Sequence, residues 1–127
     1  MSSCPHLDGN WACLNTDGSI GNEVGFAAAG GIARNRDGEW ILGFNRYLGN
    51  CSVFYAEFWG ILDGLVLLID CGYNSVFIQT DNIEAVKVIQ EKPLNGSNFD
   101  LIRRIHQLLT RISHWHIWHI FREDTGG

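Results

Sequence analysis

Apolar and polar positions along this chain change their spacing several times, and each change predicts a different element. Residues 11–17 read as a strand that begins with a short apolar run, and residues 26–34 are rich in glycine and alanine. Residues 40–45 then alternate, directly after Asp37-Gly38, a dipeptide that strongly indicates a hairpin turn. Together these segments predict three strands in an antiparallel meander.

Later segments of the chain favour helices. Between residues 53 and 71 the apolar side chains recur at helical spacing, and Gly72 stands where a helix commonly ends. A buried strand, two helices and a final aromatic strand are predicted at residues 76–81, 82–90, 97–112 and 114–121. A meander followed by helix–strand units predicts an α/β fold, with a mixed sheet covered by helices.

Composition limits the domain organisation. The 127 residues, 46% of them hydrophobic, suit a single domain over residues 11–127, preceded by a flexible arm at residues 1–10. No long apolar stretch predicts a membrane span, and no leader pattern is visible at the N-terminus. Four irregularly spaced cysteines are read as reduced thiols. We therefore expect an intracellular protein, cytoplasmic or nuclear and not secreted, without a membrane partner.

Charge bears on the choice of partners. The formal net charge is −5 at pH 7, which counts against tight nucleic-acid binding driven by charge alone. A local arginine patch or a metal-mediated phosphate contact remains compatible with this charge. Arg103, Arg104 and Arg111 lie in one predicted helix, where a solvated face is the more common role.

Three carboxylates carry the candidate chemistry. Asp17 ends the first predicted strand, Glu57 lies near the start of the long helix, and Asp81 ends the buried strand. Acids at two strand ends and a helix start can converge on one point. Converging carboxylate oxygens are the ligands that Mg²⁺ and phosphoryl-transfer chemistry need.

Each acid also has an ordinary structural interpretation. Asp17 precedes a glycine and could be a turn residue, and Glu57 could be a first-turn glutamate that complements the helix dipole. Asp81 and Glu84 have the spacing of a capping box, with Asp81 as the N-cap. Capping and metal binding are compatible, since an N-cap aspartate keeps a second oxygen.

The histidines of the last predicted strand offer a weaker site. His114 and His116 share one face of that strand, while His119 points the other way. Two ligands on a face make an incomplete zinc site. An aromatic strand with polar ends is the preferred interpretation.

Taken together, these segments are similar to ribonuclease H type 1, and most closely to the ribonuclease H-like domain of plant proteins and plant retroelement reverse transcriptases. The similarity extends over residues 13–123, and its pieces occur in the family's order and spacing. They are Leu14-Asn15-Thr16-Asp17-Gly18-Ser19, Ala28-Ala29-Gly30-Gly31-Ile32-Ala33-Arg34 with Asp37-Gly38, Ala56-Glu57 with Gly64-Leu65, Gln79-Thr80-Asp81-Asn82, and His119-Ile120-Phe121-Arg122-Glu123.

The resemblance implies a fold, a cofactor and a substrate. The fold is a five-stranded mixed sheet, an antiparallel meander plus parallel strands, with helices on both faces. Asp17, Glu57 and Asp81 match the catalytic acids that hold two Mg²⁺ ions, with Mn²⁺ as substitute, for hydrolysis of RNA in an RNA–DNA hybrid. The implied contacts to nucleic acid are Gly18, Ser19, Asn82 and Arg34, and we expect a monomer.

The sequence departs from the family at its C-terminal end. The family carries a fourth acid on a helix after the last strand, whereas this chain ends Asp124-Thr125-Gly126-Gly127. Asp124 comes too early for that role, so the final helix is expected to be lacking and cleavage to be weakened. The alternative function is a non-catalytic ribonuclease H-like module that binds nucleic acid or protein. Three intact acids favour the enzyme, because repulsion among them costs stability unless a cation is bound.

Overall fold

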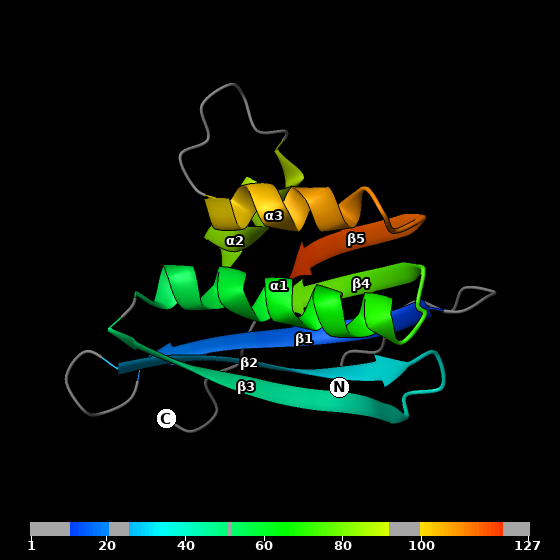
Figure 1. Ribbon diagram of the computed structural model, residues 1–127, viewed down its shortest axis with the longest axis horizontal. Coiled ribbons are helices and arrows are strands. Elements are labelled where there is room, and N and C mark those ends of the chain that lie inside the picture. Colours follow the sequence, from blue (N-terminus) through cyan, green and yellow to red (C-terminus); the bar gives the residue numbers. More distant parts are fainter. Residues whose placement is uncertain (1–10, 21–25, 51, 92–99, 121–127) are drawn as a thin grey trace.

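A computed structural model describes residues 11–20, 26–50, 52–91 and 100–120 (Figure 1). The described elements are β1 (Trp11–Ile20), β2 (Phe26–Asn35), β3 (Trp40–Asn50), α1 (Val53–Asp70), β4 (Ser75–Thr80), α2 (Ile83–Gln90), α3 (Asp100–Leu109) and β5 (His114–His119). Their order and type agree with the prediction from the sequence. The predicted arm at 1–10, residues 97–99 of the third predicted helix and residue 121 of the last strand lie outside the described residues.

The five strands form one sheet in the order β3-β2-β1-β4-β5. β1, β2 and β3 pair antiparallel, whereas β4 pairs parallel to both β1 and β5. Parallel pairing needs a crossover, which α1 supplies between β3 and β4, and α2 with α3 between β4 and β5. The predicted α/β fold with a five-stranded mixed sheet is therefore confirmed.

β2 forms in spite of its Gly/Ala-rich sequence, whose intrinsic strand propensity is low. It lies between β1 and β3 and bonds to both, so the two ladders fix its conformation. β1 also extends to Ile20, three residues beyond the predicted end, because it stays paired with β2. Asp17 therefore lies inside a paired strand.

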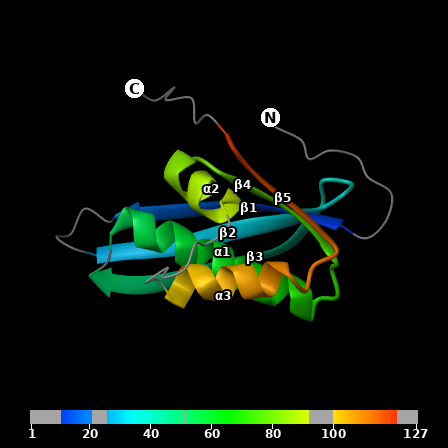
Figure 2. The same ribbon diagram turned by 90° about the horizontal axis from the view of Figure 1, so that it is seen from above.

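The three helices cover the same face of the sheet. Their buried side chains share one core cluster with Ala12, Leu14, Val76, Ile78 and Ile117 of the strands. Figures 1 and 2 show α1 and α3 side by side over that face. A helix on the opposite face, which the resemblance implied, is not among the described residues.

α1 begins and ends at positions that the sequence indicates. Ser52 caps its first turn by accepting a hydrogen bond from the backbone N–H of Tyr55, 3.1 Å away. Gly72 follows the helix with a φ of 92°, a left-handed conformation that glycine adopts at little cost.

A smaller apolar cluster lies on the sheet face opposite the helices. Trp11, Cys13 and Phe77 are buried there, with Trp118 packed against them. Cys13 is disulfide-bonded, so the expectation of reduced thiols was wrong at this position. Cys71 is an exposed free thiol, as expected. No helix among the described residues is long and apolar enough to cross a membrane.

Candidate metal centre and cleft

Asp17 and Asp81 come together because β1 and β4 are parallel neighbours. Thr16 and Thr80 are the last register partners in this pairing, so the residues that follow them lie at the same end of the β1–β4 ladder. Asp17 continues β1 opposite Gly30 of β2, and its interpretation as a turn residue was therefore wrong. Asp81 follows the last residue of β4.

Glu57 reaches this edge from α1 because the helix packs closely on the sheet. A Cβ at Gly60 would lie 3.2 Å from the backbone oxygen of Gly30, and one at Gly64 would lie 2.5 Å from Cδ2 of Leu14. Glycine at both positions therefore allows this approach without displacing the sheet or Leu14. The prediction that the glycine edge of α1 brings Glu57 toward the strand ends is confirmed.

The environment of Glu57 excludes its ordinary interpretation as a surface glutamate in the first helical turn. Its side chain is 1% exposed, and the first turn of α1 contains no acidic residue. Oε1 accepts one hydrogen bond from the Thr80 hydroxyl at 2.7 Å and one from the Thr16 hydroxyl at 3.3 Å. Both threonines are themselves buried.

Asp81 is not the helix cap that the sequence suggested. The N-cap of α2 is Asn82, whose Oδ1 accepts a hydrogen bond from the backbone N–H of Ala85 at 3.1 Å. The capping-box interpretation was therefore wrong by one residue, since a strand that ends at Thr80 leaves Asp81 before the cap. His119 supports this corner, because its Nε2 lies 3.1 Å from the backbone oxygen of Asp81 and must act as donor to that carbonyl.

The three carboxylates form one cluster. One oxygen each from Asp17, Glu57 and Asp81 lies within 4.8 Å of the others. Glu57 is buried, Asp81 is intermediate and Asp17 is exposed. Hard oxygen donors with one side open to solvent suit a divalent cation such as Mg²⁺ or Mn²⁺, which keeps some water ligands. The residues present therefore fit the metal that the resemblance implied.

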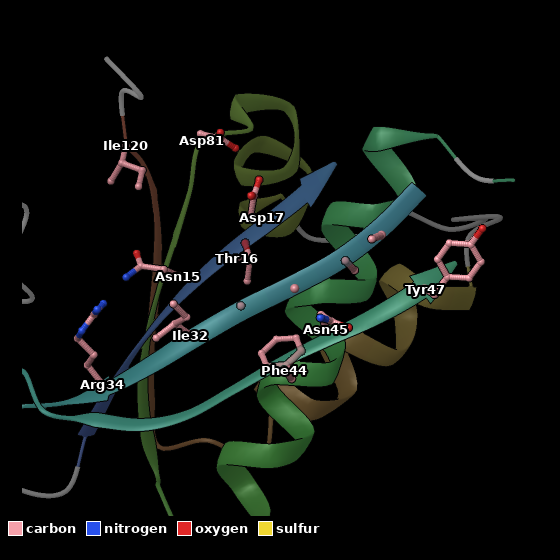
Figure 3. A pocket seen from close by; sticks show the side chains of 14 residues that line it. Asn15, Thr16, Asp17, Ile32, Arg34, Phe44, Asn45, Tyr47, Asp81 and Ile120 are labelled. Carbon is pink, nitrogen blue, oxygen red and sulfur yellow. The ribbon is translucent and has the colours of Figure 1, made fainter. Parts of the chain in front are cut away.

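A cleft of about 850 Å³ opens beside the cluster (Figure 3). Thr16 faces α1, so its neighbours Asn15 and Asp17 point to the opposite face of the sheet, where the cleft lies. Ala28 and Gly30 of β2 line the cleft, and the methyl group of alanine and the absence of a side chain at glycine leave space there. The Gly/Ala run that is poor for strand formation is thus what shapes the cleft.

Of the predicted nucleic-acid contacts, Arg34 lines the cleft and is exposed. Asn82 follows Asp81 in the chain. Its side-chain oxygen caps α2 by accepting from the backbone N–H of Ala85, and its NH₂ group takes no part in that cap. The side chains of Gly18 and Ser19 lie outside the described part of the structure. Arg46 turns away, toward α1, where a hydrogen bond to Asp63 raises the pKa of its guanidinium.

Sequence reasoning missed Thr16 and Thr80 as parts of the centre. The signal was present, because the dipeptide Thr-Asp occurs twice, at Thr16-Asp17 and Thr80-Asp81, where the β1–β4 pairing ends. It also missed His119, which was read as part of an aromatic strand. Nothing in that strand's sequence indicates which carbonyl a histidine will meet.

Comparison with known protein families assigns this chain to a family. The family model described as "Reverse transcriptase-like" matches residues 15–125, a span that includes all three acids. This chain belongs to that family. The resemblance to ribonuclease H type 1 that the motifs indicated is thereby confirmed for this reverse transcriptase-like domain.

Relatives and solved structures agree with the assignment. The domain is 31% identical over 114 residues to an Arabidopsis thaliana protein named "Putative ribonuclease H protein At1g65750"; the alignment covers 89% of this chain but 18% of that protein. Its fold is similar to RNase H1 of the archaeon Halobacterium salinarum, with a TM-score of 0.77, 22% identity and coverage of 88% and 86% of the two chains. LC11-RNase H1, solved in complex with an RNA/DNA hybrid, gives a TM-score of 0.75 at 20% identity, with coverage of 91% and 88%.

Proposed function

We propose that this reverse transcriptase-like domain is a metal-dependent endonuclease that hydrolyses the RNA strand of an RNA–DNA hybrid. The observation that carries the proposal is the cluster of Asp17, Glu57 and Asp81, with oxygens within 4.8 Å of one another beside an open cleft. A fold has no structural need for three carboxylates at one point, because their mutual repulsion costs stability. A bound cation would offset this repulsion, which explains why the three carboxylates lie together.

The cation would be Mg²⁺, with Mn²⁺ as substitute, held by the three carboxylates. Two such ions, when bound, would neutralise charge on the phosphate and supply a nucleophilic water at neutral pH. Asp17 and Asp81 hold oxygens toward the cleft, while Glu57 closes the buried side of the site. Catalytic roles for these three residues are part of the proposal.

Nucleic acid would lie in the cleft on the face of β1, β2 and β3 opposite the three described helices. Arg34 offers a guanidinium for phosphate, and Asn15 and Asn45 offer amide groups that can bond sugar hydroxyls. Gly18, Ser19 and Asn82 are proposed to contact the strand next to the acids. A hybrid as ligand is supported by the shared fold with LC11-RNase H1, which was solved with one.

Cleavage of a hybrid whose RNA strand carries an end label tests the proposal. We expect Mn²⁺-dependent cutting that is slower with Mg²⁺, since Mg²⁺ demands near-ideal octahedral geometry. Hybrid binding without cleavage with either cation would instead support the binding module.

A further inference from the structure

The hydrogen bonds of Glu57 are arranged asymmetrically. Both threonine hydroxyls, at 2.7 Å from Thr80 and 3.3 Å from Thr16, meet the same carboxylate oxygen, Oε1. They come from adjacent parallel strands at paired register positions, and each directly precedes one of the clustered aspartates. Each threonine therefore faces the helix, and an aspartate of the cluster directly follows it in the chain.

The direction of the stronger bond is fixed by a second contact. The backbone N–H of Asn82 donates to Oγ1 of Thr80 at 3.2 Å. This hydroxyl oxygen accepts a hydrogen bond from Asn82, and its own O–H donates to the carboxylate of Glu57. Thr80 is fully buried and Glu57 is 1% exposed, so water does not compete for either group.

We propose that Thr80 and Thr16 are positioning residues that hold Oε1 of Glu57 in the protein, so that Oε2 is the oxygen presented to a cation with Asp17 and Asp81. This inference rests on the proposed metal site. Thr80 acts more strongly than Thr16 because its bond is 0.6 Å shorter, 2.7 against 3.3 Å. A merely structural role, in which the hydroxyls only satisfy a buried carboxylate, would not predict a change in cation affinity.

The test is the affinity of the folded protein for Mn²⁺, measured by titration calorimetry on Thr80→Val and Thr80→Ser. Valine keeps the branched shape and removes the hydroxyl, whereas serine keeps the hydroxyl. Loss of a partner that orients a metal ligand commonly costs about tenfold to a hundredfold in affinity. We expect at least a tenfold higher Kd for Thr80→Val and an unchanged Kd for Thr80→Ser. Thr110→Val is the matched control, because Thr110 is exposed and its hydroxyl donates to the backbone oxygen of Gln107, far from the carboxylate cluster in the sequence.

Two further variants show whether the effect passes through Glu57. We call the two threonine bonds to Oε1 of Glu57 the clamp. Thr16→Val should raise the Kd for Mn²⁺ about threefold, and this variant tests the clamp even if Thr80→Val does not fold. In a Glu57→Gln background, Thr80→Val should cause no additional loss. Parent-like Mn²⁺ affinity in Thr80→Val would overturn the clamp. If Thr80→Val does not fold, parent-like affinity in Thr16→Val would overturn it. The clamp would also be overturned if Thr80→Val lowered Mn²⁺ affinity as much in the Glu57→Gln background as in the parent.

Asp17→Asn separates failure of the clamp from failure of the proposed function. If the metal site is right, Asp17→Asn loses most Mn²⁺ binding whatever the threonine variants do. Loss in Asp17→Asn with parent-like affinity in Thr80→Val would reject the clamp alone. Parent-like affinity in Asp17→Asn would reject the metal site and the clamp together.

Discussion

Gly64→Ala tests whether close packing of α1 on β1 is what delivers Glu57 to the site. The added Cβ would lie 2.5 Å from Cδ2 and 2.7 Å from Cδ1 of Leu14. Ordinary contacts between carbon atoms are about 3.5–4.0 Å, so the distance between the added Cβ and the Leu14 side chain must increase by roughly 1 Å. Leu14 is fully buried in the main core, which leaves its side chain little room to turn away. The helix must therefore move outward.

The expected cost combines two opposing terms. Overpacking of a core costs about 1–3 kcal/mol, while replacing a glycine by alanine within a helix returns up to about 1 kcal/mol. We expect a net loss of about 1–2 kcal/mol in the free energy of unfolding. An outward shift of about 1 Å would also stretch the 2.7 Å bond between Thr80 and Glu57 beyond hydrogen-bond range, so Mn²⁺ affinity should fall as well.

Urea unfolding and Mn²⁺ titration measure the two effects. Gly43→Ala is the control for adding a methyl group, because its Cβ would meet nothing closer than 3.6 Å, at the Trp40 ring. Leu14→Ala should cost less in the Gly64→Ala background than in the parent, because it removes the atoms that clash. A Gly64→Ala protein as stable as the parent, with unchanged Mn²⁺ affinity, would refute the reasoning.

Two further outcomes follow from the site. Mn²⁺ or Mg²⁺ at 20 mM should stabilise the parent by about 1.8 kcal/mol if its Kd is near 1 mM, seen as a higher Tm, and Asp17→Asn should lose most of that gain; an equal Tm increase in both proteins would contradict it. Asn82→Ala should lower the free energy of unfolding by about 1 kcal/mol through loss of the α2 cap, whereas Asp81→Asn should leave the cap intact; an equal loss of stability in both would mean that the capping residue is misassigned.

The convergence of the acids could be predicted because it follows from backbone periodicity. Asp17 and Asp81 end apolar runs that become neighbouring parallel strands, and the spacing of Glu57, Gly60 and Gly64 marks one edge of a helix. Each step depends only on side-chain period and on the size of glycine. Such patterns are visible in a single sequence.

What could not be predicted depends on register and on side-chain contacts between distant segments. The length of β1 was set by its ladder with β2, and the cap of α2 moved to Asn82 because β4 ended one residue earlier than expected. The bonds from Thr16 and Thr80 to Glu57 join residues 41 and 23 positions apart. Neither the sequence period nor the propensity of a threonine indicates such a partner.

The most direct measurement is the position of Mn²⁺ in crystals of this chain, located by its anomalous scattering. We expect a peak bound by carboxylate oxygens of Asp17, Glu57 and Asp81, with Glu57 using the oxygen that the threonines do not hold. Asp81→Asn crystals grown in the same Mn²⁺ concentration should show a weaker peak or none. A peak elsewhere on the protein, or none at the three acids under conditions where the hybrid is cleaved, would contradict the central claim.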